Sequence, residues 1–202
     1  MMKTDNPSST GRSRFVFILV VALFVLPFVA AYWLYQRTVT GGVWGTTNHG
    51  ILIQPVQPLE NVVLTDQDGE PYTVERFRGH WTMVFIPSDP CPEDCMKNIY
   101  YMRQIWASLG RNANRMQRVL LLENGQQKQD LSDFLTAYPE TGIIVDEQMQ
   151  LISQFKSVMP NKESSILLVD PLASIMMVFT RSTDPRDILK DLKKLMKASQ
   201  AG

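Results

Sequence analysis

The sequence predicts an α/β fold, in which a central mixed sheet has helices on both faces, behind one N-terminal transmembrane helix. Three observations support this: an uncharged apolar run near the N-terminus, short apolar segments that alternate with helical patterns from residue 60 onwards, and a strand pair near the C-terminus. Such alternation is typical of a sheet with helices on both faces. The 202 residues leave room for one domain of about 100 to 150 residues and an anchor.

The transmembrane prediction rests on residues 15–35, which contain no charged side chain. At about 1.5 Å per residue, a helix of this length crosses a hydrocarbon core of about 30 Å. Pro27 is tolerated in such a helix, and Tyr32, Trp33 and Tyr35 stand where aromatic rings favour the membrane boundary. The alternative is a cleaved signal peptide, whose apolar core is usually only about 7 to 15 residues.

Charge predicts the orientation. Lys3, Arg12 and Arg14 precede the span against the single acid Asp5, and basic flanks tend to stay cytoplasmic. We therefore expect a bacterial inner-membrane protein with a cytoplasmic tail (1–14) and a periplasmic remainder. Without the tail, 17 basic and 19 acidic side chains remain, which gives no basic stripe for nucleic acid.

Residues 36–59 are rich in Gly and Pro and predict a stalk, and residues 60–199 predict the globular domain. The domain opens with a hairpin, 62–64 and 72–74, around the turn Asp66-Gln67-Asp68-Gly69. A buried strand, 81–86, then leads into a helix that ends near Gly110. The remaining predicted strands are 119–122, 143–145, 165–169 and 175–180, and the remaining helices are 130–138, with Asp130 as its cap, 147–156 and 184–198.

Cys91 and Cys95 stand at the junction of the buried strand and its helix, on the side of the membrane where disulfides persist. Helical positions four apart share a face, with β-carbons about 5 to 6 Å apart, so the thiols can meet if the first turn unwinds on oxidation. The helix dipole lowers a thiol pKa, whereas Glu93 and Asp94 raise it. Two thiolates also suit a soft metal ion, although they are too few for a closed zinc site.

A static disulfide is the alternative interpretation of the cysteine pair. Closing so short a loop stabilises the fold by only about 1 to 2 kcal/mol, so a purely structural bridge would gain more from distant partners.

The order of anchor, strand 81–86, Cys91-Pro92-Glu93-Asp94-Cys95, helix and the late strand end Leu168-Val169-Asp170-Pro171 resembles the Sco/SenC family over roughly residues 60–198. The resemblance implies a thioredoxin-like fold and a role in assembling the copper centre of cytochrome c oxidase. It also implies copper held by both cysteines and a histidine. The matching position here is Lys162, and a protonated lysine has no free lone pair. The chain is therefore expected to be a divergent member without the copper-ligand histidine.

Three other candidate ligands are interpreted as ordinary residues. His49 falls in the predicted stalk, and His80 begins the buried strand at the end away from the cysteines. Both are expected to be surface or turn residues. Met96 adjoins Cys95 and could offer a thioether to Cu(I), but helix methionines more often fill a core.

The leading hypothesis is an accessory factor for oxidase assembly, with an oxidase subunit or another assembly factor as partner. It would act by thiol–disulfide exchange, in which Cys91 attacks and Cys95 resolves, or by transient Cu(I) handling through both sulfurs. Whether the chain is a thiol–disulfide oxidoreductase stays open. The alternative is a membrane-tethered scaffold with a structural disulfide. Peroxidase chemistry is disfavoured, because the two acids are poor neighbours for an activated thiolate.

Overall fold

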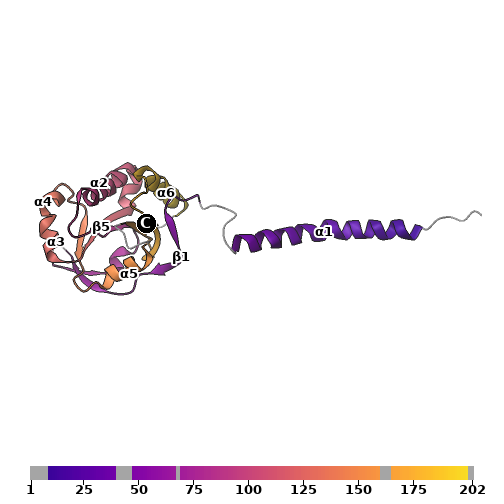
Figure 1. Ribbon diagram of the computed structural model, residues 1–202, viewed down its shortest axis with the longest axis horizontal. Coiled ribbons are helices and arrows are strands. Elements are labelled where there is room, and N and C mark those ends of the chain that lie inside the picture. Colours follow the sequence, from indigo (N-terminus) through magenta and orange to yellow (C-terminus); the bar gives the residue numbers. More distant parts are fainter. Residues whose placement is uncertain (1–8, 40–46, 67–68, 160–164, 200–202) are drawn as a thin grey trace, which may run out of the picture. The chain divides into compact units, whose positions relative to one another are not determined.

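The computed structural model describes residues 9–39, 47–66, 69–159 and 165–199. The chain divides into two compact units, residues 1–47 and 48–202. The first unit contains helix α1 (Ser9–Val39; Figure 1). Pro27 lies inside this helix. Within Arg14–Gln36 of this helix, an 18-residue window has a mean hydropathy of 2.8, so that α1 is long and apolar enough to be a membrane anchor. The helix is thus confirmed, and its passage through a membrane stays a prediction.

The second unit is built on a mixed sheet in the order β1-β8-β7-β4-β5-β6-β2-β3. Its central strands β4 (Trp81–Phe85), β5 (Met116–Leu122) and β6 (Gly142–Val145) run parallel. On the other side of β4, strands β7 (Ile166–Val169), β8 (Ser174–Phe179) and β1 (Ile51–Pro58) are antiparallel to their neighbours. The predicted α/β class with a central mixed sheet is confirmed.

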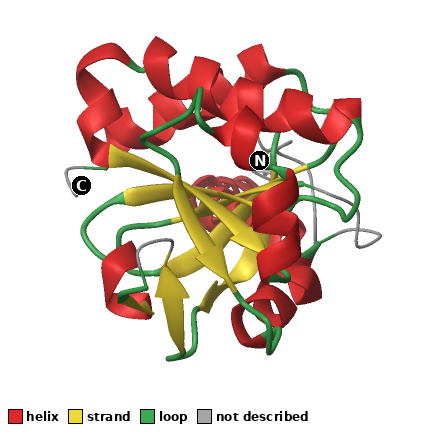
Figure 2. Cartoon of the chain, turned by 90° about the vertical axis from the view of Figure 1, so that its left-hand side faces the viewer, coloured by secondary structure: helices red, strands yellow, loops and turns green. Residues whose placement is uncertain are grey.

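Helices cover both faces of this sheet (Figure 2). On one face, Met83 and Phe85 of β4 join a core with α2 (Glu93–Ser108), α4 (Ser132–Leu135) and α6 (Pro185–Ala198). The short helix α3 (Gly125–Asp130) precedes α4. On the other face, Val84 joins α5 (Gln150–Val158) and the 3-10 turn η1 (Val74–Phe77). A second 3-10 turn, η2 (Gly110–Arg115), precedes β5. Successive residues of β4 point to opposite faces, as the pleat requires.

The predicted hairpin is confirmed as β2 (Val63–Asp66) and β3 (Pro71–Thr73), which pair antiparallel. Gln67 and Asp68 of its turn lie outside the described residues. The helix predicted at 130–138 is instead the pair α3 and α4, and its cap is Asn124, whose side chain accepts a hydrogen bond from the Gln127 amide. The prediction of Asp130 as a cap was wrong because the helical segment begins earlier, where Asn124, two residues after β5 ends, binds a free amide of the first turn.

The predicted stalk, 36–59, also needs correction, because residues 51–58 form the edge strand β1. This strand pairs with β8 through Ile51 and Val178, and its register shifts between Leu52 and Gln57. Proline is tolerated on edge strands and at irregularities, where the ladder does not need its amide. Because of Pro55 and the shifted register, this strand lacks the regular alternation by which strands are predicted from sequence.

Candidate functional site

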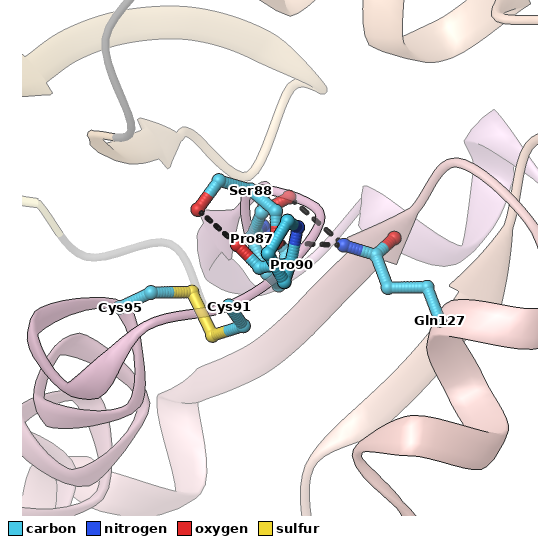
Figure 3. The surroundings of a disulfide bond; sticks show 6 residues. All are labelled: Pro87, Ser88, Pro90, Cys91, Cys95 and Gln127. Atoms are coloured by element: carbon cyan, nitrogen blue, oxygen red, sulfur yellow. Dashed lines mark hydrogen bonds between the residues drawn. A yellow bond between two sulfur atoms is a disulfide. The ribbon is translucent and has the colours of Figure 1, made fainter.

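The two cysteines form a disulfide at the carboxyl end of β4, where the chain leaves the sheet and enters α2 (Figure 3). Their Cα atoms are 5.3 Å apart, within the ordinary range for a bridge. Pro92 is the N-cap, and the amides of Cys95 and Met96 donate to its carbonyl oxygen at 2.9 and 3.1 Å. Cys91 therefore precedes the helix. The expectation that the first turn of the helix must unwind to form the bridge was wrong, because Cys91 lies outside that turn.

The two sulfur-bearing residues differ in exposure. Cys95 is 4% exposed and belongs to the core beneath α2, whereas Cys91 is only partly buried against that core. An incoming thiolate can attack only a disulfide sulfur that it can reach. The exposure of the two sulfurs therefore decides which of them reacts. The geometry thus makes Cys91 the sulfur that is more open to another molecule.

A buried glutamine that the sequence analysis missed holds the loop before Cys91. Gln127 is 2% exposed, and its Nε2 donates to the carbonyl oxygens of Pro87 at 3.0 Å and Ser88 at 3.2 Å (Figure 3). Its Oε1 accepts from the amide of Glu123 at 3.0 Å. The carbonyls that Gln127 binds are about forty residues away in the sequence, so local patterns do not reveal this role. The only local signal is Asn124, which caps the helix that contains Gln127.

Charges around the first turn of α2 balance one another. Lys97 Nζ lies 2.9 Å from Glu93 and 3.5 Å from Asp94, and Arg181, just after β8, forms an ion pair with Asp94. The hydrogen bond from Arg181, its charge and the nearby Lys97 hold the pKa of Asp94 below its usual value. Two cations therefore offset the negative charge of the two acids between the cysteines. The acids alone do not determine the reactivity of the thiols.

The two histidines contact groups other than the cysteines. His80 precedes β4, and its Nδ1 lies 3.4 Å from the carbonyl oxygen of Arg78. His49 is not in a free stalk: its Nδ1 lies 3.1 Å from Asp191 and its Nε2 3.5 Å from Asp187, both on α6. Its environment was missed because the partners are some 140 residues away in the sequence.

The donor set near the bridge does not complete a copper site. Among the residues that the structure describes, no three His, Cys, Asp or Glu side chains converge as metal ligands. The cysteine sulfurs would become thiolate donors only after reduction, and Lys162 lies outside the described residues. Met96 is partly buried in α2. The residues that the structure describes therefore do not form a closed copper site.

A family profile described as transmembrane-like, thioredoxin-like, C-terminal domain matches residues 81–199. Over 91 residues the chain is 24% identical to a protein of Stutzerimonas stutzeri described as copper-binding. That match spans 44% of this chain and 45% of the relative, so less than half of the relative's length is covered.

Three solved structures with this fold have informative descriptions. Bradyrhizobium japonicum ScoI with copper bound is 18% identical, with a TM-score of 0.54, over 68% of this chain and 98% of that one. BsSco, described by a disulfide switch and as a cytochrome c oxidase assembly protein, is 16% identical, with a TM-score of 0.57, over 73% and 99%.

The third structure is described as a thiol:disulfide interchange protein, DsbE, from Chlorobium tepidum. It is 17% identical, with a TM-score of 0.53, over 71% of this chain and 95% of that one. At identities this low, the structural similarity establishes a shared fold and nothing more. The predicted thioredoxin-like fold and the resemblance to Sco/SenC proteins are thereby confirmed.

Proposed function

Because the chain belongs to the transmembrane-like, thioredoxin-like C-terminal domain family, we propose that it is a membrane-anchored thiol–disulfide factor that acts through Cys91 and Cys95. The observation that carries the proposal is the bridge itself, which joins an accessible Cys91 to a buried Cys95 at a strand-to-helix junction. An accessible sulfur with an adjacent resolving partner is what exchange chemistry requires.

The reaction moves two electrons between the cysteine pair and a partner protein. In the reduced chain, the Cys91 thiolate attacks one sulfur of a partner disulfide, forms a mixed disulfide and releases the other partner sulfur as a thiolate. The Cys95 thiolate then attacks the Cys91 sulfur, which closes the bridge and releases the second partner thiolate. The partner disulfide is reduced to a dithiol and the chain is oxidised. A dithiol protein reverses these steps to restore the reduced chain.

The protein contributes position and charge to these steps. Gln127 holds the carbonyls of Pro87 and Ser88, so the chain that carries Cys91 leaves the sheet in one direction. Arg181 and Lys97 offset the acids of the first helical turn. Cations near a cysteine favour its thiolate, which is the reactive form.

We further propose that the partner is a component of cytochrome c oxidase assembly: an oxidase subunit or another assembly factor. The fold shared with an oxidase assembly protein described by a disulfide switch supports this role. The apolar helix α1 supports an inner-membrane anchor, with residues 1–14 in the cytoplasm and the folded unit in the periplasm.

Transient Cu(I) handling is a second candidate function. It is favoured by the copper-bound structural neighbour, and the two thiolates of a reduced pair are soft donors of the kind that Cu(I) takes. In this role copper is cargo rather than a resident cofactor. Competition titration of Cu(I) against the reduced full-length protein and its Cys91→Ser/Cys95→Ser variant tests it, and equal affinities would remove it.

The exchange proposal is tested by oxidase maturation in a strain that lacks the gene and is complemented with variants. We expect Cys91→Ser/Cys95→Ser to abolish complementation. Cys95→Ser should accumulate mixed disulfides through Cys91, while Cys91→Ser should not. Asn98→Ser in the same helix is the control and should behave as the wild type.

Normal oxidase maturation with the double serine variant would refute the proposed activity. A measured reduction potential below about −300 mV would instead favour the structural-disulfide scaffold, because such bridges resist physiological reductants.

A further inference from the structure

A cavity of about 580 Å³ lies at the edge of the sheet that is remote from the disulfide. It is lined by Met116 to Val119 at the start of β5, by Gly142 at the start of β6 and by His80 just before β4. Because these three strands are parallel, their amino ends share one edge, and the cysteines follow the opposite end of β4. The cavity therefore takes no part in the proposed exchange reaction.

Arg118 is unusual among the residues that line this cavity, because it carries a charge and is only 4% exposed. Its guanidinium carbon lies 4.5 Å from the centroid of the Trp106 ring. Nη2 donates to Glu140 at 3.3 Å, and Nη1 is buried with no hydrogen-bond partner among the described residues. Burial lowers the pKa of Arg118, Glu140 opposes that shift, and the charge of Arg103 adds to it.

Two further guanidinium groups line the same cavity, and each is held in place. Arg76 lies over the Tyr72 ring at 5.2 Å from its centroid and pairs with Asp66 at 2.9 Å. Arg78 pairs with Glu75 at 3.0 Å and donates to a backbone carbonyl at 3.3 Å. The arginines are thus already oriented, so little conformational entropy is lost when they bind a ligand.

A buried guanidinium with a vacant donor is expensive to keep, because a desolvated charge needs both an opposite charge and its hydrogen bonds. Glu140 compensates the buried charge of Arg118 only weakly. Its side chain is 65% exposed, and its contact with the guanidinium is a single hydrogen bond of 3.3 Å. A carboxylate or phosphate group that displaced Glu140 could engage the guanidinium with two parallel hydrogen bonds. The Glu140 carboxylate then occupies the place that a ligand anion would take.

We propose that this cavity binds a small polyanion with carboxylate or phosphate groups, with Arg118 at one anionic group and Arg76 at another. The cavity volume falls within the range of about 300 to 1,000 Å³ that is usual for small-molecule sites. Phosphate and carboxylate both match the guanidinium fork. This proposal is independent of the proposed function, because it uses neither cysteine.

The test is calorimetric titration of the full-length chain, in an uncharged detergent at constant ionic strength, with citrate and with pyrophosphate. We expect saturable binding of at least one probe with a Kd below about 1 mM. Arg118→Met should weaken binding by about tenfold or more, since a charge-assisted bidentate contact is lost, and Arg76→Met by less. Glu140→Gln should strengthen it by removing the competing carboxylate.

Arg186→Met is the matched control, because Arg186 is exposed on α6 outside the cavity, and its loss changes the net charge equally. It should leave binding unchanged. Absence of saturable binding for both probes would overturn the proposal, as would equal affinities for the wild type, Arg118→Met and Arg76→Met. If Arg118→Met does not fold, the affinities of Arg76→Met and Glu140→Gln test the proposal, because these side chains are 47% and 65% exposed and their replacement should leave the fold intact.

Discussion

Gln127 beside the disulfide and Arg118 in the cavity at the opposite edge are both almost completely buried, at 2% and 4% exposure. Gln127 uses both of its amide hydrogens and its oxygen in hydrogen bonds to backbone groups. Arg118 has one long contact and one buried donor without a partner in the described chain. The difference teaches that Gln127 is fully hydrogen-bonded and holds its loop in place, whereas Arg118 keeps a donor without a partner at the edge where we propose that an anion binds.

The largest expected effect is at Asp191 on α6, a buried carboxylate whose hydrogen bonds are formed. It is 2% exposed and accepts hydrogen bonds from the amides of His49 at 2.7 Å and Gly50 at 2.9 Å. We expect Asp191→Asn to lower the free energy of unfolding by about 2 to 4 kcal/mol, because an amide group would oppose those donors. Urea denaturation measures this. Asp187→Asn, one turn earlier and more exposed, is the control and should change stability less.

Hydrogen exchange sharpens the same prediction, because the Asp191 contacts hold the residues that lead into β1. Gly50 packs closely there, and a Cβ on it would meet the Met177 sulfur at 2.5 Å. Exchange of the amides of 48–58 should rise more in Asp191→Asn than in Asp187→Asn, because Asp191 accepts from two backbone amides of this segment, within which Asp187 contacts only the His49 ring. Equal exchange in both variants would mean that packing alone holds this strand.

Gln127→Leu tests whether the cysteine edge depends on its satisfied amide. Leucine fills a similar volume but leaves three backbone groups without their partner, which should cost about 1 to 3 kcal/mol. It should also loosen the loop before Cys91, so that exchange with a dithiol substrate changes in rate. Gln129→Leu, exposed on the same helix, is the control. If both variants match the wild type, the glutamine does not position the loop.

Tyr72 gives a pH test at the cavity edge. Burial raises its pKa to about 12, against a lowering contribution from Arg76. The unfolded chain loses this proton near pH 10, so the stabilisation is complete below that pH and is lost as the pH rises towards the folded pKa. The expected loss is about 1.4 kcal/mol between about pH 9 and about pH 11. Denaturation across this range should show that loss in the wild type and not in Tyr72→Phe.

Arg118→Met asks whether the buried cation stabilises the fold. Methionine keeps much of the packing on Trp106 and removes a desolvated charge, while the exposed Glu140 returns to water. We therefore expect a change in unfolding free energy below about 1 kcal/mol. Chemical denaturation without added anions is the measurement. A loss of several kcal/mol would show that Arg118 is structural and would end the contrast with Gln127.

The smallest effect should come from Arg181, whose pairing with Asp94 is exposed to solvent. Arg181→Met removes a cation close to the cysteine turn, so alkylation of reduced Cys91 should slow by about two- to threefold at low salt and less at high salt. Timed alkylation followed by mass spectrometry measures this. Arg186→Met should have no effect. A change that persists undiminished at high salt would point to geometry rather than charge.

The sequence alone determined the features that depend on neighbouring residues. The uncharged run gave α1, the apolar β-rich run before Cys91 gave β4, and alternation of segments gave the sheet with helices on both faces. The cysteine pair at the strand-to-helix junction was also predictable, because its two members are four residues apart. Such patterns reflect local periodicity and burial, which a sequence displays directly.

Only the tertiary structure decided the contacts between distant segments. β1 is an edge strand with a proline and an irregular register, so its pairing with β8 leaves little periodic trace. Gln127 reaches carbonyls about forty residues earlier, and Arg118 meets Trp106 and Glu140 from other elements. A polar side chain is structural or available for binding according to whether the fold satisfies its hydrogen bonds, and that depends on neighbours that the chain order does not show.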